Sequence, residues 1–584
     1  MDRHERTHTH THEYEYDDKE LPTTIAITQT DRRNTDTTTD TCSGYSTETE
    51  DSDTNTLEQP GPVELSRIET YRLQQKTTVG SSRGPQPRET WLPMGANKEY
   101  PPLLPDPEGF VVEFDGPDDG LHPHNWTMVK RIFLVCILTY STFANSFTSA
   151  VFSAGIGSVT EEFNIGREVA SLGVTLFVLG FAAGPVVWAP MSEVVGRRWP
   201  VYIGFFGSGV FTIACATAKD VQTIMLTRFF GGLFAASPLT LVPAIFADLF
   251  PTAQRGIVMS VFCMAVFIGP FAAPFVGGFI DMALGWRWIM YISAIMIFLG
   301  FGSVVLWMDE TYAPVILVNK AAILRRQTHN WGIHAKQDEV EVAFSELIRN
   351  NFFRPLRMLV TEPILLLVSL YISFVYGLMY ALLGAYPVVF QEVYKMNLGV
   401  SGLAFIGLII GELLGGVYVL LLQGSYKRKL AANDGKPVPE WRLTPAIVGS
   451  VAFSAGLFWF GWSGYREDIH WMAPVASGLL TGFGIFCIFL QCFNYIVDCY
   501  PTLAASTIAA NTILRSAVGA SFPLFSRQLM ENLGVQWAGT LLGCIAAAMI
   551  PIPVLFKIYG PWLRSKSKLA GAPVPALVEK KVDV

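Results

Sequence analysis

The stretch that decides the fold is Gly184–Pro200, with the sequence GPVVWAPMSEVVGRRWP. It joins two apolar runs, residues 168–190 and 199–218, through a turn that is too short to link two domains. The turn contains one acid, one glycine and two adjacent arginines: Glu193, Gly196, Arg197 and Arg198. A basic turn between two membrane helices faces the cytoplasm, because Lys and Arg are retained on that side. We therefore expect a membrane protein in which this turn lies inside the cell.

The overall composition also indicates a membrane protein. Of 584 residues, 51% are hydrophobic and only 16% are charged, which is too apolar for a soluble chain of this length. The net charge of -7 says little about a substrate, because the acidic surplus lies in the polar N-terminal region. Seven of the eight cysteines lie in or beside apolar runs, which does not favour disulfides or a metal site. We expect no bound metal and no other cofactor.

From residue 130 onward the sequence contains twelve apolar runs, and each is long enough to cross a hydrocarbon core of roughly 30 Å as a helix of about 20 residues. They span residues 130–152, 168–190, 199–218, 222–246, 256–280, 286–308, 363–387, 401–423, 444–463, 471–498, 504–528 and 536–559. The expected fold class is an all-α membrane protein with twelve transmembrane helices in two six-helix halves.

The division into domains follows from composition and loop length. The chain is expected to comprise a disordered cytoplasmic N-terminal tail over 1–125, a six-helix half over 126–308, a linker over 309–362, a second half over 363–560, and a C-terminal tail over 561–584. The first tail is rich in Thr, Asp, Glu and Pro, so it buries too little apolar surface to offset its ordering entropy. The linker contains amphipathic pieces, 320–326 and 338–349, which we expect to lie along the membrane surface. Basic residues in the short loops place both termini and the linker in the cytoplasm.

A short internal repeat supports two related halves. Asp248-Leu-Phe-Pro-Thr252 recurs as Asp498-Cys-Tyr-Pro-Thr502, and Gly269 recurs as Gly519 in the same register. Both copies join the fourth and fifth predicted helices of their half. Chance could produce so short a repeat, but its placement in equivalent loops favours duplicated halves.

The loop that opens this section resembles the signature of the major facilitator superfamily. The resemblance lies in the order of Ala189, Glu193, Gly196, Arg197 and Arg198. The family pattern usually begins with Gly and has Asp followed by a basic residue, whereas this chain has Ala189, Glu193 and Val194 at those places. The resemblance implies parallel halves related about the membrane normal.

Further stretches are similar to the fungal drug:proton antiporter branch of that family, which includes polyamine, azole and toxin exporters. They are His122–Trp126 with Lys130 and Arg131, Asn494–Asp498, Ala509–Arg515 and Phe522–Phe525. Two other stretches resemble motifs of the wider superfamily: Ile268–Gly278 looks like the motif that marks antiporters, and Leu226–Gly232 looks like the motif with a buried arginine, here Arg228. The resemblance covers about residues 130–560. It implies a plasma-membrane antiporter that uses the proton gradient to export a small, partly apolar organic compound by alternating access.

The fifth predicted helix contains the stretch that looks like the antiporter motif. Its residues are Gly269, Pro270, Pro274, Gly277 and Gly278. Small residues at four-residue spacing, Ala265 to Gly277 here and Gly407 to Gly415 in the eighth helix, allow close approach of neighbouring helices. Since the inferred fold brings helices five and eight together, we expect the two stripes to form a rocking contact, with static close packing as the alternative.

Three charged residues lie inside apolar runs: Arg228, Glu412 and Arg515. An ionised acid in mid-membrane is costly unless it is paired or faces water, so intramembrane acids are functional by default. Glu412 is therefore the candidate for proton coupling, and a fixed pair with Arg515 or Arg228 is the alternative. The arginines cannot release a proton, and we expect them to have structural or electrostatic roles.

A charge network is expected at the cytoplasmic ends of the first-half helices. Its predicted members are Glu193, Gly196, Arg197, Arg198, Asp248, Arg255 and Glu310, which would close the inner side while the outer side is open. Ordinary topology signals are the alternative for these charges. Four neutral polar residues, Asn145, Gln491, Asn494 and Asn511, either line a cavity or bond a neighbouring helix.

The sequence shows no phosphate-binding loop of the Gly-x-x-x-x-Gly-Lys type and no enzyme motif, so we expect neither ATP-driven pumping nor catalysis. The expected partners are a small-molecule substrate and the lipid bilayer, without nucleic acid, and the chain is expected to act as a monomer. A polyamine exporter and a non-transporting membrane sensor remain as alternative functions.

Overall fold

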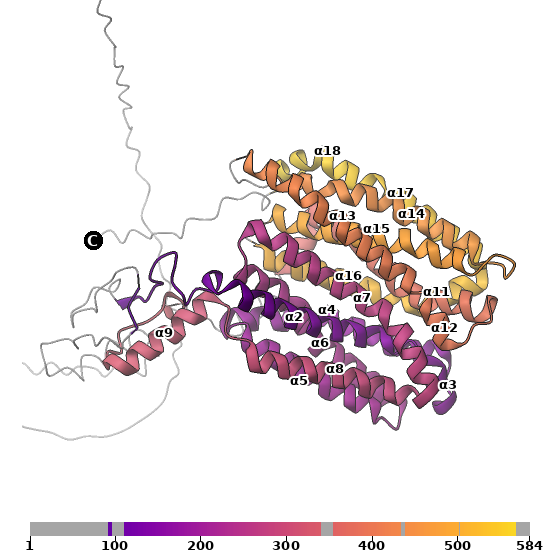
Figure 1. The fold of residues 1–584 in the computed structure, drawn as a ribbon, viewed down its shortest axis with the longest axis horizontal. Helices are drawn as coiled ribbons and strands as arrows, with labels where there is room; N and C mark the ends of the chain where they lie inside the picture. Colours follow the sequence, from indigo (N-terminus) through magenta and orange to yellow (C-terminus); the bar gives the residue numbers. More distant parts are fainter. Residues whose placement is uncertain (1–91, 96–109, 340–353, 434–437, 501–502, 568–584) are drawn as a thin grey trace, which may run out of the picture. The chain divides into compact units, whose positions relative to one another are not determined.

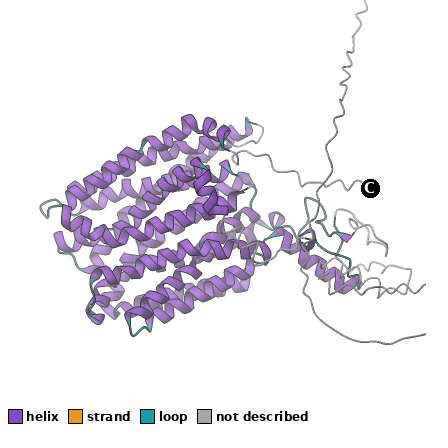
Figure 2. Cartoon of the chain, turned by 180° about the vertical axis from the view of Figure 1, so that it is seen from behind, coloured by secondary structure: helices purple, strands orange, loops and turns teal. Residues whose placement is uncertain are grey.

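The computed structural model describes residues 92–95, 110–339, 354–433, 438–500 and 503–567. Within these residues the regular elements are helices, and the secondary-structure view shows no strand (Figure 2). Eleven helices of the described chain are long and apolar enough to cross a membrane. The protein is therefore a multi-pass membrane protein.

The first half is built from six long helices, coloured indigo to magenta in Figure 1. They are α2 (Met128–Val151), α4 (Arg167–Val194), α5 (Arg198–Ala216), α6 (Val221–Leu249), α7 (Thr252–Leu284) and α8 (Trp286–Trp307), with the short α3 (Ile156–Phe163) between α2 and α4. Several helices extend past the predicted apolar runs. The predicted runs counted only apolar residues, whereas a helix continues into the polar residues at its ends.

The second half repeats this set with three irregularities. Its helices are α11 (Pro363–Pro387), α12 (Leu398–Leu403), α13 (Ile406–Ala431), α14 (Leu443–Ser463), α15 (Met472–Cys499), α16 (Ala504–Leu533), α17 (Val535–Met549) and α18 (Pro551–Lys566). A π-helical segment, η4 (Val388–Val393), extends α11, and α12 and α13 are two pieces of the predicted eighth helix. The predicted last helix is divided before Pro551, whose ring removes a backbone donor.

The eleventh predicted helix, α16, does not reach the hydropathy of the other spans although its 30 residues are long enough. The cause is a set of polar side chains that lie buried inside the protein: Thr507, Asn511, Thr512, Arg515, Ser516 and Ser526. Helix α16 packs against α11 in its own half and α4 in the other half. Its polar residues are therefore shielded from lipid between the two halves.

The helix contacts repeat between the halves. In the first half α2 packs on α7, α4 on α6, α5 on α6 and α5 on α8; in the second α11 packs on α16, α13 on α15, α14 on α15 and α14 on α17. Between the halves, α4 contacts α16 and α7 contacts α12 and α13. The expected meeting of the fifth and eighth helices is confirmed, and the six-helix halves are related as the short repeat indicates.

The end of the predicted disordered tail differs from the expectation. Residues 92–95 and 110–125 are described, and Phe110 and Val112 pack with Leu324 of α9 (Ala313–Thr328) in a small apolar cluster. The backbone of His334 exchanges hydrogen bonds with this segment, accepting from Val112 N at 2.9 Å and donating to Phe110 O at 3.0 Å. The apolar residues near the end of a polar tail were sufficient to fold it against the linker.

The same cluster changes the interpretation of the linker. Buried Ala321 and Leu324 of α9 contact protein, so this part of the amphipathic piece 320–326 does not lie free on a membrane surface. The Lys320 side chain is 1% exposed, with its Nζ atom 3.7 Å from Asp115 and 4.0 Å from Asp119. We call this assembly of residues 92–95, 110–125 and 313–339 the tail-linker module. Most of the second amphipathic piece, 338–349, lies outside the described residues, as do residues 1–91, 96–109 and 568–584 of the tails.

Candidate functional site

The predicted network at the loop between α4 and α5 is centred on Arg197. Its Nε atom lies 3.1 Å from Asp248 at the end of α6, and its Nη1 atom donates to Ser192 Oγ at 2.6 Å. Glu310, which follows α8, accepts from the backbone N–H groups of Arg197 at 2.9 Å and Arg198 at 3.2 Å. A carboxylate at a helix N-terminus is stabilised by the helix dipole. The network thus joins the ends of α4, α5, α6 and α8.

Gly196 has a specific reason to be glycine in this loop. Its φ angle is +96°, and a Cβ atom built there would lie 2.3 Å from Glu310 Oε2. Left-handed backbone is unfavourable for other residues. Glycine therefore allows Glu310 to approach the start of α5.

The side chains of the other predicted charged members do not hydrogen-bond to Asp248 or Glu310. Arg198 donates through Nε to Tyr202 Oη at 2.8 Å, and Arg255 donates to Ala247 O at 3.1 Å. The side chain of Glu193 makes no ion pair or hydrogen bond with a described residue, although the charge of Arg197 acts on it at longer range. Asp248 and Glu310 are therefore the acids that hold Arg197 and its loop.

The second half contains an equivalent set of contacts that the sequence analysis missed. Arg442, at the end of η5 (Pro439–Arg442), donates through Nε to Asp498 at the end of α15. Glu440 in the same loop accepts from Nε and Nη2 of Arg564 in α18, each at 3.0 Å. The repeat around Asp248 and Asp498 was the available signal, since it already marked both acids. Residues 501–502 of that repeat lie outside the described residues.

The glycines of the antiporter-like motif pack α7 against two partners. A Cβ atom at Gly269 would lie 2.8 Å from Phe147 N, and one at Gly277 would lie 3.0 Å from Ala154 Cβ, both in or just after α2. A Cβ at Gly278 would instead lie 2.8 Å from Leu398 O of α12, in the other half. Pro270 and Pro274 lie inside the same helix. The motif holds α7 between its own half and the opposite one.

The prediction that two small-residue stripes face each other is wrong. Gly407 and Gly411 of α13 pack on α15 of the same half, where added Cβ atoms would lie 2.2 Å from Val475 O and 2.3 Å from Leu479 O. Contact between α13 and α7 uses Gly416, whose Cβ would lie 2.9 Å from Met264 Sδ. A four-residue spacing identifies a close-packing face but not the helix that packs on it.

Each side-chain nitrogen of Arg228, near the start of α6, has a hydrogen-bond partner. Its Nε, Nη1 and Nη2 atoms donate to the carbonyls of Gly173, Thr148 and Ser149 at 2.8, 3.0 and 2.9 Å. Its guanidinium also lies 4.2 Å from the ring centre of Phe177. Arg228 therefore joins α6 to α2 and α4, which supports the structural role.

Arg515 differs from Arg228, because it has no hydrogen-bond or ion-pair partner among the described residues. The residue is 5% exposed, and its guanidinium lies 5.0 Å from the ring centres of both Tyr376 and Phe489. Both side-chain amide atoms of Asn511, one helical turn away, also lack partners among the described residues. This polar face of α16 lies beside a small cavity of about 10 Å³ lined by Arg515, Thr512, Phe489 and Cys263.

Glu412 of α13 is 0% exposed, and neither carboxyl oxygen has a hydrogen-bond partner among the described residues. It forms no ion pair with Arg515 or Arg228, so the structural pair considered as an alternative is not present in this conformation. Burying an unpaired carboxylate charge is costly. The described conformation therefore offers no hydrogen bond to stabilise a charge on Glu412.

The other predicted polar residues have different surroundings. Asn145 is buried, donates to Ser141 O at 3.1 Å and accepts from Ser208 Oγ at 2.7 Å, so it bonds α2 to α5. Gln491 lines a cavity of about 180 Å³ near Arg442, within the second half. Asn494 is half-buried without a side-chain hydrogen bond to a described residue. Among these four, only Asn511 lies beside Arg515.

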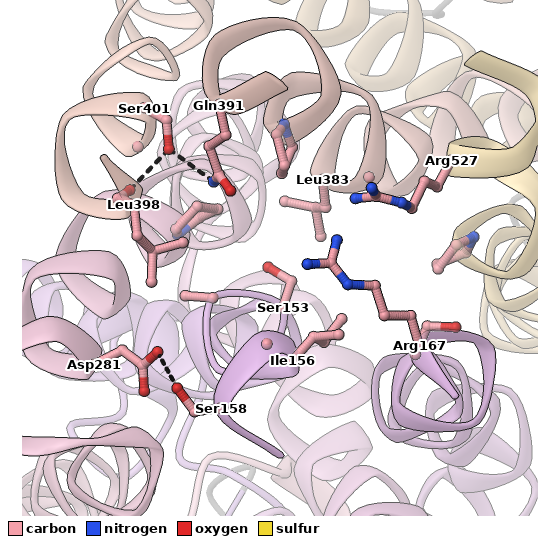
Figure 3. A pocket seen from close by; sticks show the side chains of 18 of the residues that line it. Ser153, Ile156, Ser158, Arg167, Asp281, Leu383, Gln391, Leu398, Ser401 and Arg527 are labelled. Carbon is pink, nitrogen blue, oxygen red and sulfur yellow. Dashed lines mark hydrogen bonds between the residues drawn. The ribbon is translucent and has the colours of Figure 1, made fainter. Parts of the chain in front are cut away.

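A larger cavity of about 270 Å³ opens between the halves at the end opposite to Arg197. We call it the vestibule, and the side of the bundle on which it opens is taken as the outer side in the proposals below. It includes Ser153, Arg167, Pro274, Leu383 and Arg527, and in Figure 3 the side chains of Arg167 and Arg527 project toward its interior. One turn deeper than Leu383 and Gly384, Tyr380 Oη and Ser149 Oγ lie 2.8 Å apart and join the halves. This hydrogen bond lies between the vestibule and Arg515.

No group of three or more His, Cys, Asp or Glu side chains among the described residues could hold a metal ion. The described helices form a two-halved bundle with the vestibule at one end, the Ser149–Tyr380 hydrogen bond between the halves, and charge networks at the other end. Such a bundle can expose a central site to alternate sides when the halves rock.

Comparison with known proteins decides the family. The family model for the Major Facilitator Superfamily matches residues 138–523. The chain belongs to the major facilitator superfamily. It is therefore a membrane transporter, and the resemblance noted from its loop motifs is confirmed.

Relatives within this superfamily are similar over most of their length. The chain is 45% identical over 479 residues to Multidrug transporter TPO1_2 of Candida glabrata, covering 82% of this chain and 83% of that one. It is 43% identical over 534 residues to Major facilitator superfamily multidrug transporter FLU1 of Candida albicans, covering 88% and 86%. Among solved structures, the proton:xylose symporter XylE matches with a TM-score of 0.54 at 16% identity, covering 75% of this chain and 97% of XylE. That likeness concerns the fold alone.

Proposed function

We propose that this chain exports small, partly apolar organic compounds across the plasma membrane in exchange for protons. Support comes from relatives named as multidrug transporters at 43–45% identity over more than four fifths of the chain. The contact pattern between two repeated halves fits alternating access. The driving force is the proton gradient, and the transporter acts as a monomer without a bound cofactor, with both termini in the cytoplasm.

The observation on which proton coupling rests is the buried, partnerless carboxyl group of Glu412. In the described conformation the neutral carboxyl is favoured, because an ionised one would be buried without compensation. A conformation that hydrates Glu412 would favour proton release. A ligand shifts a conformational equilibrium only if it binds the two conformations with different affinities. The different proton affinities of Glu412 in the buried and the hydrated conformation therefore link proton binding to the change of access.

The inner networks and the vestibule support an outward-facing state. Arg197 with Asp248, and Arg442 with Asp498, hold helix ends at the inner side of each half. Arg255 lies within the electrostatic influence of Asp248 and of Asp498, so it acts between the halves. Opening the inner side would require these charges to separate.

Polyamine export is the less favoured alternative. A polyamine has several positive charges and would be stabilised by several buried acids, whereas the small cavity beside α16 is lined by the cation Arg515, whose Nε atom has no partner among the described residues. Like charges in a medium of low dielectric constant repel strongly. The charge at this position therefore supports a substrate that is neutral or anionic.

Transport into inside-out plasma-membrane vesicles tests the proposal. The host should lack its own drug exporters, and the compounds should be an azole, an aromatic carboxylate and spermidine. An acidic lumen should drive uptake of the azole or the carboxylate, each uptake should raise the lumenal pH, and a protonophore should abolish both signals. Uptake that is unchanged by the imposed pH gradient would contradict proton exchange.

A further inference from the structure

The polar face of α16 contains side chains whose hydrogen-bonding capacity the described protein does not satisfy. Arg515 is 5% exposed and Asn511 is 1% exposed, yet the Nε atom of Arg515 and both amide atoms of Asn511 lack partners among the described residues. Buried polar groups are normally hydrogen-bonded, because leaving them unpaired is costly. Arg515 and Asn511 are four residues apart and so lie on one face of the helix.

The internal repeat shows that the first half packs without a charge at the position equivalent to Arg515. Gly519 corresponds to Gly269, and each allows a close approach: their Cβ atoms would lie 2.7 Å from Tyr376 Cδ1 of α11 and 2.8 Å from Phe147 N of α2. In the same register, the residue corresponding to Arg515 is the buried Ala265 of α7. A buried alanine meets the packing requirement in the first half, so Arg515 needs another explanation.

Aromatic rings surround the guanidinium group of Arg515. Tyr376 and Phe489 lie at 5.0 Å from it, and Phe267 lies 4.5 Å from Phe489 in an edge-on arrangement. Arg515 and Phe489 both line the small cavity between α6, α7, α15 and α16. Guanidinium recognises a carboxylate by two parallel hydrogen bonds, and aromatic side chains contact a planar ring through stacked or edge-on geometry.

We propose that Arg515 and Asn511 form the recognition site for the acidic group of an anionic aromatic substrate. The carboxylate or phenolate accepts hydrogen bonds from the guanidinium and from the Asn511 amide, and the substrate ring lies against Phe489 and Tyr376. The described conformation leaves only about 10 Å³ beside Arg515, so the aromatic side chains must move apart as the substrate enters. This inference rests on the proposed function and specifies its substrate class.

Binding to the purified full-length protein in nanodiscs tests the inference without a proton gradient. The probes are 2-naphthoate and its neutral analogue 2-naphthamide, which share a ring system and differ in charge. The unchanged protein should bind naphthoate at least about tenfold more tightly, since one charge-assisted bidentate pair is lost in the amide. Equal affinities for the two probes would overturn the proposal.

Substitutions test which residue causes the preference for naphthoate over naphthamide. Arg515→Gln should bind the two probes equally, Arg515→Lys should retain part of the preference, and Arg466→Gln, in an exposed outer loop, should behave as the unchanged protein. Asn511→Ala is a second test in case Arg515→Gln folds poorly. It should weaken naphthoate binding by about threefold or more, as expected for one lost hydrogen bond. An undiminished preference in a folded Arg515→Gln protein, or its loss in Arg167→Gln alone, would overturn the assignment.

The binding experiment and the transport experiment can refute the binding site and the proposed function independently of each other. Export of a neutral azole driven by a pH gradient, together with equal binding of the two probes, would remove the substrate class and leave the proposed function in place. Preferential naphthoate binding through Arg515, with no compound moved by a pH gradient, would remove the proposed function and leave the binding site.

Discussion

Arg197 Nε lies 3.1 Å from a carboxylate oxygen of Asp248, at the point where the start of α5 meets the end of α6. Arg442 and Asp498 repeat this contact where α14 meets α15. In both halves the acid belongs to the short sequence repeat and the base to the loop two helices earlier. The repeat thus marks two equivalent contacts at the same end of the bundle.

Neutralising Asp248 should impair transport more than neutralising Glu193. Asp248→Asn removes the charge partner of Arg197, whereas Glu193 makes no ion pair with a described residue. An incompletely buried pair contributes about 1 kcal/mol, so folding should persist while the balance of conformations shifts. Transport rates normalised to surface expression should fall several-fold for Asp248→Asn and little for Glu193→Gln. The reverse order would contradict this account of the inner network.

Replacing Gly196 should destabilise the protein. Gly196→Ala places a Cβ atom 2.3 Å from Glu310 Oε2 and forces a non-glycine residue to a φ of +96°. The backbone strain alone costs roughly 1–2 kcal/mol. A lower thermal unfolding temperature in detergent is expected. Gly302→Ala is the matched control, because an added Cβ in α8 meets nothing within 4 Å; equal losses in both variants would refute the explanation.

The tail-linker module predicts a sharp limit to truncation at the N-terminus. Deleting residues 2–91 keeps Met94, Phe110 and Val112, which are buried at 1–6% exposure. Deleting residues 2–112 removes all three from their contact with α9, leaving Ala321 and Leu324 exposed. The first deletion should retain transport, whereas the second should lower surface expression. Loss of transport with normal expression after deletion of residues 2–91 would contradict this limit, because that deletion keeps the whole tail-linker module.

Acid should weaken the contact between α3 and α8 at the outer end. A hydrogen bond from Arg287 lowers the pKa of Glu162 below its usual 4.5, and Trp286 also donates to it at 2.7 Å. A lowered folded-state pKa contributes stability above the unfolded pKa, and that stability is lost as the pH falls through the folded value. The exposed pair contributes at most about 1 kcal/mol. The thermal unfolding temperatures of Glu162→Gln and of the unchanged protein should differ at pH 7 and should converge at pH 3. A temperature difference that does not change with pH would be inconsistent with this contact.

Much of the fold followed from properties that depend on single segments. The length of the apolar runs predicted the helices, and the repeat predicted the relation between the halves. Helix α16 was predicted although buried polar residues such as Asn511 and Arg515 lower its hydropathy, because its apolar residues still extend over a sufficient length. The predictions that failed concern segments whose structure depends on distant contacts. Residues 110–125 are an example, because their order comes from packing on α9.

The site was harder to predict for the same reason. Arg228 and Arg515 look alike as single charges in apolar helices, yet one donates to three carbonyls and the other lacks a hydrogen-bond partner among the described residues. Likewise, the Gly407 stripe was recognisable, but only coordinates reveal that it packs on α15. Spacing within one helix does not encode which neighbour lies opposite.

The most direct test of proton exchange compares the unchanged protein with Glu412→Gln in proteoliposomes that report both compound movement and internal pH. Glutamine keeps the shape of the side chain at this buried position and cannot titrate. Glu467→Gln, in an outer loop, is the matched control. The account predicts that Glu412→Gln loses accumulation driven by a pH gradient while compound-for-compound exchange persists. Full accumulation coupled to proton movement in Glu412→Gln would contradict it.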